Sequence, residues 1–386
     1  MTEPKLWGYA RPDGQIGIRN YVAIVAVMDN SCPTARRVAS AVRGAVPVAP
    51  GAGRGLVGID LEQHFRTLIG IGSSPNVYGA VVISLEPKTA KVVADGIART
   101  GRPVEVLALE EVGGTVKATE LATRAAIEML AMAGKLPRVP LPWSELIVGL
   151  ECGGSDGSSG MVSNPVTGMV ADRVVARGGT VILSETLEIL GGEHLLAPRA
   201  KNEEVASQLV AAVDAVVAYA KELGIDVMGT NPAPDNIAGG LSTIEEKALG
   251  AIKKGGSTTL NEVVGYGIRP REKGLVFMDA PAPGLENLTA LSAAGTHLII
   301  FSTGKGNPAA SPICPTIKVS GNPYTTKKLR DNLDVDLSPV IVEGMPMEEA
   351  ARILEDELVA VCDGKQVRAE ILGEVETAIS RLLQSL

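Results

Sequence analysis

Short apolar runs of strand length alternate with helical patterns along most of the chain, and this alternation constrains the fold more than any other feature. In the first third, apolar runs at 21–28, 80–85 and 104–109 are separated by helical patterns such as 33–43 and 88–99. This alternation predicts strand–helix–strand units, in which parallel strands form a sheet and helices cover both of its faces. We therefore expect an α/β protein.

The proline-rich stretch 135–143 (KLPRVPLPW) separates this first series from a second one that begins near residue 145. We predict a linker there, between an N-terminal α/β domain over 1–134 and a C-terminal α/β catalytic domain over 144–386. Each domain should contain a mostly parallel sheet flanked by helices, and a chain of 386 residues suits two such cores. Only 3% of the residues are aromatic, so Val, Ile, Leu and Ala must fill the cores, as in buried parallel strands.

The net charge indicates which classes of partner suit the chain, and its cysteine usage indicates the compartment. The formal net charge of −8 argues against nucleic acid or an anionic membrane as a partner, but it is compatible with an anionic substrate in a local cationic pocket. The sequence shows neither a signal-peptide pattern nor an apolar stretch of about 18 residues. Its four cysteines are scattered without a CxxC pair, which favours a reducing cytoplasm over a disulfide framework.

Polar, glycine-rich turns follow several of the predicted strands, at the sheet edge where open α/β sheets bind ligands. The longest turn is 151–160 (ECGGSDGSSG), and it leads into a helical pattern that begins at Asn164 and Pro165. Glycine lets the backbone approach a ligand closely, and free N–H groups at a helix start can hold an anion. A solvated loop is the alternative, although ten residues with Cys, Asp and three Ser exceed what a connector needs.

Four further turns carry ionisable side chains. The stretch 184–188 (SETLE) offers two carboxylates that could bind a metal or act as an acid–base pair, or it could be an ordinary helix cap with acids in its first turn. The loop 231–241 leads to Lys247, and a capping box of Ser242 and Glu245 would not explain that lysine.

The last two turns follow apolar strand patterns at 277–279 (FMD) and 303–307 (TGKGN), and Lys318 comes soon after. The turn at 303–307 is typical of a carboxylate or phosphate cradle, although the full GxxxxGK[ST] motif is absent. No pair among the three histidines has metal-ligand spacing, and we interpret His64 and His297 as structural.

These motifs together resemble the galactarate/altronate dehydratase family. The resemblance rests on ECGGSDGSSGMVSNPVTG, ILSETLEILGGEH, NIAGGLSTIEEKALG, FSTGKGN and PTIKVSGN, and on the opening GYARPDGQIGIRNYV, in the family's order and nearly end to end. The segments GRGLVGIDLEQHFRTLIGIGSSPNVYGAVVISLEP and GNPAASPICPTIKVSGNP are most similar to the large subunit of (2R)-3-sulfolactate sulfo-lyases. Sugar-acid dehydratases usually carry His-x-x-Gly-Cys-Gly and Gly-Cys-Glu where this chain reads GRGLVGID and SLE. Gly154 departs in the other direction, since it matches the general family form where the sulfo-lyase branch has Glu.

The resemblance implies a lyase that performs β-elimination on a small anionic 2-hydroxy acid with the help of a divalent metal, for which Fe²⁺ is the first expectation. The best expectation is conversion of (2R)-3-sulfolactate to pyruvate and sulfite. One alternative is a split altronate- or galactarate-type sugar-acid dehydratase, and a remote one is a non-catalytic binding subunit. Single-chain family members carry an extra small β-rich N-terminal domain. The resemblance therefore implies a hetero-oligomer with a separate partner of about 80–100 residues, which would supply metal-ligating histidines.

Candidate roles follow from side-chain chemistry within this resemblance. The catalytic candidates, expected to act as acids, bases or anion clamps, are Lys247, Glu188, Lys305 and Lys318. The candidate metal ligands are Cys152, Asp156 and Glu185. The candidate substrate contacts are Arg19, Asn20, Ser155, Ser159, Asn164, Asp279 and Asn307. For Arg19, the alternative is that it ties the first strand to the sheet.

Overall fold

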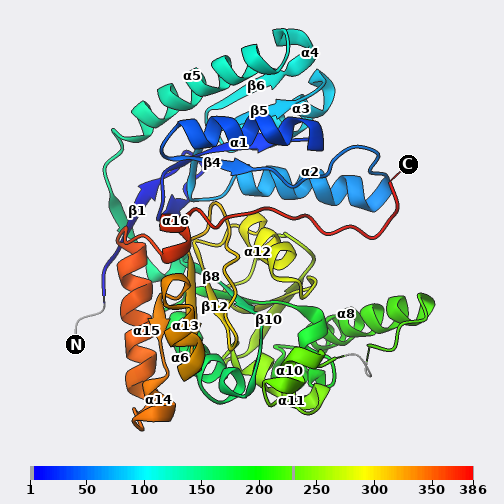
Figure 1. The fold of residues 1–386 in the computed structure, drawn as a ribbon, viewed down its shortest axis with the longest axis vertical. Helices are drawn as coiled ribbons and strands as arrows, with labels where there is room; N and C mark the ends of the chain where they lie inside the picture. Colours follow the sequence, from blue (N-terminus) through cyan, green and yellow to red (C-terminus); the bar gives the residue numbers. More distant parts are fainter. Residues whose placement is uncertain (1–3, 228–230, 386) are drawn as a thin grey trace.

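The computed structural model describes residues 4–227 and 231–385 and consists of two α/β units, one above the other in Figure 1. The upper unit contains a parallel sheet with the strand order β4-β3-β5-β6. Its strands are β3 (Tyr21–Ala26), β4 (Ala45–Val48), β5 (Val77–Ser84) and β6 (Val104–Ala108). Helices α1 (Cys32–Ala41) and α5 (Thr115–Ala133) cover one face, and α2 (Gly58–Gly72) and α3 (Pro87–Ala98) cover the other.

The lower unit is built on a larger sheet with the order β10-β11-β9-β8-β12-β13-β14, in which every printed strand pair within the described residues is parallel. Its strands are β8 (Ile147–Cys152), β9 (Thr180–Leu183), β10 (Leu260–Val264), β11 (Gly274–Met278), β12 (Leu298–Ser302), β13 (Thr316–Ser320) and β14 (Val335–Asp336). Its main helices are α6 (Asn164–Ala176), α8 (Glu203–Glu222), α11 (Ile244–Lys253), α12 (Gly284–Ala293) and α15 (Met347–Cys362), and the shorter ones include α10 (Pro234–Ala238), α13 (Pro323–Lys328) and α16 (Arg368–Leu372).

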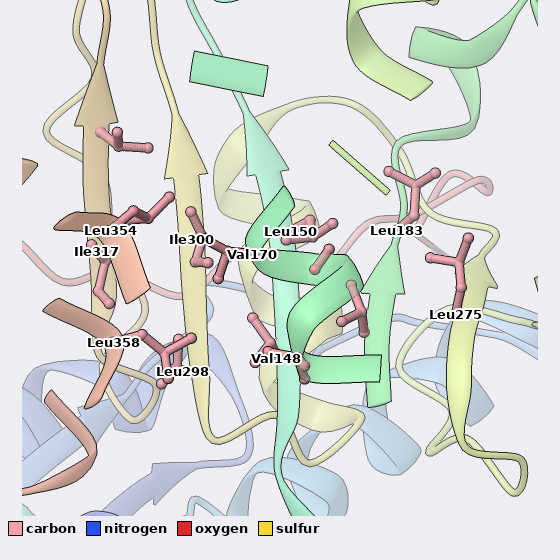
Figure 2. Close-up of a cluster of buried hydrophobic side chains, with 14 of the residues drawn as sticks. Val148, Leu150, Val170, Leu183, Leu275, Leu298, Ile300, Ile317, Leu354 and Leu358 are labelled. Carbon is pink, nitrogen blue, oxygen red and sulfur yellow. The ribbon is translucent and has the colours of Figure 1, made fainter. Parts of the chain in front are cut away.

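Continuous apolar runs form the central strands because helices cover both faces of this sheet. All residues of β8, β9, β11, β12 and β13 are buried. On one face, Val148 and Leu150 of β8 pack with Val170 of α6 and Leu354 of α15 (Figure 2). On the other face, α12 packs against the sheet and against α2 of the upper unit. Hydrophobic burial on both faces selects Val, Ile and Leu rather than an alternating pattern.

The α/β prediction is confirmed, and the structure adds a small antiparallel sheet that the sequence did not predict. Its strands are β1 (Leu6–Ala10), β2 (Ile16–Gly17) and β7 (Val139–Leu141), in the order β2-β1-β7. Strand β7 lies within the proline-rich stretch 135–143, so this stretch pairs with residues near the N-terminus. Strands of two to five residues are too short to show a period in the sequence.

The C-terminal tail runs from the lower unit back across the upper one, along α2 (Figure 1). The backbone N–H groups of Leu382 and Leu383 donate to the two oxygens of the buried Asp60 carboxylate, over 2.9 and 2.7 Å. Ile379 is buried in the cluster that also contains Leu68 of α2. The tail therefore ties the two units together.

The predicted capping box at the start of α11 is wrong by one residue. Thr243 is the residue that caps the helix, accepting a hydrogen bond from the backbone N–H of Glu246, whose carboxylate in turn binds the backbone N–H of Ser242 over 2.8 Å. Over the described ranges, no helix combines the length and the apolar composition needed to cross a membrane.

Candidate active site

A small pocket lies beyond the carboxyl end of β8, where strand β8 passes into the turn 151–160. Helix α6 and helix α11 supply its walls, and the glycines of the turn let the chain bend over it. Six residues that the sequence predicted for the site line this pocket: Cys152, Ser155, Asp156, Ser159, Asn164 and Lys247. The structure therefore brings together residues that lie nearly a hundred positions apart in the sequence.

A buried ion pair lies next to the pocket, and one of its members was not predicted. Glu185, which follows β9, forms a salt bridge with Lys254 at the end of α11, and both side chains are completely buried. The same carboxylate accepts the backbone N–H of Cys152 over 3.0 Å and its thiol over 3.5 Å. Among the described residues, Glu185 is the one non-glycine residue with a positive φ, 73°. Strained backbone of this kind concentrates at functional sites.

Burial and the neighbouring charges shift the pKa values of the residues in this cluster. Burial raises the pKa of Glu185 to about 7, although the neighbouring Lys254 opposes the change. Burial also raises the pKa of the Cys152 thiol, to which the Glu185 charge adds. Burial alone would lower the pKa of Lys254, but the surrounding Cys152, Glu185 and Glu151 raise it. Lys254 is therefore a fixed cation, and Cys152 stays a thiol near neutral pH.

A second ion pair reaches the pocket itself. Lys247 of α11 lies 2.9 Å from an oxygen of Glu188, which sits in the short helix η4 (Thr186–Ile189). The Lys247 ammonium also donates to Asn231 Oδ1 over 2.9 Å. The other carboxylate oxygen of Glu188, Oε2, is buried and has no hydrogen-bond partner among the described residues. A cation that lines the pocket and an incompletely paired carboxylate thus lie side by side.

Asp156 anchors the turn 151–160. Its carboxylate accepts hydrogen bonds from Ser158 Oγ over 2.6 Å and from the backbone N–H of Ser159 over 3.1 Å. It also accepts one from Asn322 Nδ2 over 2.7 Å. Gly304 packs so closely against this carboxylate that no side chain would fit there. The turn is therefore held to two other loops of the same sheet edge.

Three more predicted residues lie near the carboxyl ends of the strands of the lower sheet. The backbone N–H of Lys305 donates to Gly154 O over 2.8 Å, and its side chain is exposed. Asn307 Nδ2 would lie 3.3 Å from a Cβ placed on Gly153. Asp279, which follows β11, accepts a hydrogen bond from Thr186 Oγ1 over 2.6 Å.

The structure does not bring Arg19, Asn20 or Lys318 to the pocket. Arg19 forms a largely buried salt bridge with Glu370 of α16 over 2.8 Å. Its role is structural, but it ties the chain before β3 to the C-terminal segment rather than to the sheet. Asn20 Nδ2 donates to Ala133 O over 2.7 Å, at the amino end of β3. Lys318 lies within β13 and donates to the carbonyl of Pro308, and burial lowers its pKa to about 8. Lys318 therefore supports the loop that follows Asn307.

Sequence reasoning missed Lys254, Glu151 and Asn287. Lys254 ends an amphipathic helix beside Lys253, a pattern that is typical of solvated helix ends, so no local signal marked it as buried. Glu151 was part of the noted turn, and its pKa is well above the usual range because it is buried and lies near Glu185. Asn287 of α12 donates to Glu151 Oε2.

In the described part of the chain, the carboxylates of the predicted metal ligands are paired with protein groups. The carboxylate of Glu185 is paired with Lys254 and Cys152, and that of Asp156 is occupied by the turn and by Asn322. Within the part of the chain that the structure describes, no three His, Cys, Asp or Glu side chains gather as a metal would need. The ligand set predicted from Cys152, Asp156 and Glu185 therefore does not fit a divalent metal without other groups.

Comparison with known proteins places the chain in a family. Residues 143–385 match the model of the D-galactarate/altronate dehydratase C-terminal domain, and residues 8–134 match that of the D-galactarate dehydratase/altronate hydrolase second domain. The chain is 38% identical to the (2R)-sulfolactate sulfo-lyase subunit beta of Chromohalobacter salexigens, over 98% of this chain and 97% of that subunit.

Two dehydratases are also similar. The altronate dehydratase of Bacillus subtilis is 30% identical over 96% of this chain, which covers 76% of that enzyme. The galactarate dehydratase (L-threo-forming) of Escherichia coli is 32% identical over 78% of this chain and 59% of its own length. With both family models matched in order and the relatives named as lyases or dehydratases, the chain belongs to the D-galactarate/altronate dehydratase family and is an enzyme of the lyase class.

Proposed function

We propose that this chain is the large subunit of a lyase that performs β-elimination on a small anionic 2-hydroxy acid, with (2R)-3-sulfolactate as the substrate and pyruvate and sulfite as the products. The observation that carries the proposal is the ion pair of Glu188 with Lys247, which lines the pocket beyond β8. The similarity to a sulfolactate sulfo-lyase subunit over nearly the full length of both chains supports this choice of substrate.

In this reaction, Glu188 and Lys247 have different roles. Glu188 accepts the proton from C2 through its unpartnered oxygen, and the C2–H electron pair becomes the C2=C3 bond. The C3–S bond breaks, and its electron pair leaves with sulfur as sulfite. The resulting enolpyruvate takes up a proton at C3 and loses the proton of its 2-hydroxyl, which gives pyruvate. Lys247 stabilises the charge that develops on the substrate carboxylate, a contribution that is typically worth about 100-fold or more in rate.

The buried cluster of Cys152, Glu185 and Lys254 positions the floor of the pocket in this scheme. Substrate access requires movement, because the pocket has a volume of about 10 Å³, roughly the room of one water molecule. Leu241, Glu246 and Lys247 line its side toward α11. This side must move outward to admit a hydroxy acid.

The proposal includes a small β-rich partner of about 80–100 residues and a cytoplasmic enzyme. The similar Chromohalobacter protein is named a subunit, which supports a partner polypeptide. The four cysteines are free, which is in keeping with a reducing compartment. A divalent metal is still a prediction of the family resemblance. Since no ligand set for it gathers among the described residues, no step above is assigned to it.

A substrate panel on the enzyme purified with its partner tests the function. We expect equal amounts of pyruvate and sulfite from (2R)-3-sulfolactate, and a rate loss of about 100-fold or more in Lys247→Met with the fold unchanged. The matched control is Lys253→Met, because that lysine lies on the same helix α11 and is exposed. Retained turnover in Lys247→Met would exclude its proposed role.

A split sugar-acid dehydratase is the second candidate. The 30% and 32% identities to altronate and galactarate dehydratases favour it. It predicts a 2-keto-3-deoxy acid from altronate or galactarate and no sulfite from sulfolactate. A binding subunit without catalytic activity would turn over none of these acids.

A further inference from the structure

The side chain of Asn231 is joined to the pair of Glu188 and Lys247, yet the reaction above gives it no role. Lys247 Nζ donates to Asn231 Oδ1 over 2.9 Å and lies 2.9 Å from Glu188 Oε1, so an amide and a carboxylate flank one ammonium group. Asn231 is more than nine-tenths buried. An ammonium group only donates, so the amide atom that faces it must be the oxygen, and the orientation of this amide is thereby fixed.

The amide nitrogen of Asn231 is a buried donor without an acceptor. Asn231 Nδ2 has no hydrogen-bond partner among the described residues, and the same holds for Glu188 Oε2. Folded proteins pair nearly all buried polar atoms, and the exceptions call for a ligand or another explanation. Here one donor and one acceptor are left over on the two groups that flank the same cation, which suits a ligand that brings an acceptor and a removable proton.

Lys247 has a donor to spare beside this amide nitrogen. An ammonium group carries three N–H donors. One of them bonds Asn231, and the ion pair with Glu188 engages a second, so the third remains for a ligand. This N–H and Asn231 Nδ2 together offer two donors, which match the two oxygens of one carboxylate. A neutral amide group would match less well, because only one of its two ends accepts a hydrogen bond.

We propose that Asn231 is a substrate-binding residue whose Nδ2 donates to the substrate carboxylate beside Lys247. This inference rests on the proposed function, because it completes the contacts of that substrate's carboxylate. C2 is bonded directly to the carboxylate carbon, so a substrate held by Lys247 and Asn231 presents C2 to Glu188 on the other side of the ammonium group. As Glu188 removes the C2 proton, negative charge grows on the carboxylate oxygens, and both donors bind it more strongly in the transition state. The outward movement of the α11 side, which substrate access already requires, opens this space.

Asn231→Asp separates this role from a purely structural one. Aspartate has the shape of asparagine, and its carboxylate still accepts the hydrogen bond from Lys247, so the lysine stays in place. The atom that faces the substrate changes from a donor to an anionic oxygen, which repels a carboxylate. Asn202→Asp is the matched control. It adds the same charge at an exposed residue, and aspartate caps α8 as well as asparagine does.

The probes are L-lactate, which has the C2 arrangement of (2R)-3-sulfolactate without the sulfonate, and its neutral amide L-lactamide. Ligand-observed nuclear magnetic resonance measures their binding to the assembled enzyme. We expect the wild-type enzyme to bind L-lactate about tenfold or more tightly than L-lactamide, and Asn231→Asp to lose about tenfold or more of the L-lactate affinity and, with it, this preference. An unchanged L-lactate affinity in Asn231→Asp would overturn the inference. Equal affinity of the wild-type enzyme for both probes would also overturn it, and this comparison needs no variant that must fold.

Failure of this role and failure of the proposed function give different results. If Asn231→Asp turns over sulfolactate with the wild-type kcat/KM, the role of Asn231 is wrong and the function stands. If Asn231→Asp loses L-lactate binding while the wild-type enzyme releases neither pyruvate nor sulfite from sulfolactate, the carboxylate contact stands and the proposed function is wrong.

Discussion

Removal of the Lys254 charge tests the central cluster most directly. In Lys254→Met the methylene stem is kept and the ammonium is lost, so Glu185 remains buried without its cation. Both side chains are 0% exposed, so solvent does not screen the interaction. Removing one partner of such a pair typically costs about 3–5 kcal/mol of unfolding free energy. Lys253→Met is the matched control, since this neighbouring lysine is exposed and should change stability by less than about 0.5 kcal/mol.

The cost of Lys254→Met should depend on pH. The folded-state pKa of Glu185 is raised from 4.5 to about 7, so the folded state holds this proton to a higher pH than the unfolded state does. Glu185 therefore lowers stability as the pH rises through the window from 4.5 to 7, and losing Lys254 extends that window upward. A protonated Glu185 has no charge to pair. The destabilisation should be larger at pH 8 than at pH 5.5.

Urea unfolding followed by circular dichroism at these two pH values measures the effect. The double variant Lys254→Met/Glu185→Gln should recover most of the lost stability, because it removes both buried charges. This variant also covers the case in which Lys254→Met alone does not fold. The reasoning is refuted if Lys254→Met at pH 8 is no more destabilising than Lys253→Met.

The other predictions concern contacts outside the pocket. Arg19→Ala should cost about 3–5 kcal/mol by leaving Glu370 buried and unpaired, without changing KM; a raised KM in the folded variant would return Arg19 to substrate binding. Asp60→Ala removes the acceptor of two backbone hydrogen bonds, each worth about 1.5–3 kcal/mol, and should speed proteolysis of the C-terminal tail; an unchanged cleavage rate argues against that contact. The chain without its partner should hold well under one equivalent of Fe²⁺, because no metal-ligand set gathers among the described residues; elemental analysis showing one tightly bound ion per chain would contradict this.

The sequence carries enough information to predict the sheets and the location of the site. Fully buried strands read as unbroken apolar runs, and carboxyl ends of parallel strands meet at one edge. The turns 151–160, 184–188 and 303–307 could therefore be grouped without coordinates. The pocket also depends on α11, whose position relative to β8 no local pattern specifies.

Pairing between distant side chains could not be predicted in this way. From the sequence, Asp156 is a plausible metal ligand, but in the structure its carboxylate accepts a hydrogen bond from Asn322, 166 residues later. From the sequence, Arg19 is a plausible anion-binding residue, but in the structure it forms a salt bridge with Glu370. Propensity and period describe only near neighbours along the chain, whereas these roles depend on which charge lies across a tertiary contact.

The tail that crosses α2 has a consequence for biosynthesis. The upper unit is translated first, yet the backbone of Leu382, which donates to Asp60, lies 322 residues further along the chain, and Ile379 lies close to it. This surface of α2 therefore stays uncovered until the lower unit has been translated. A chain truncated before Ile379 lacks the contacts that tie the tail to α2.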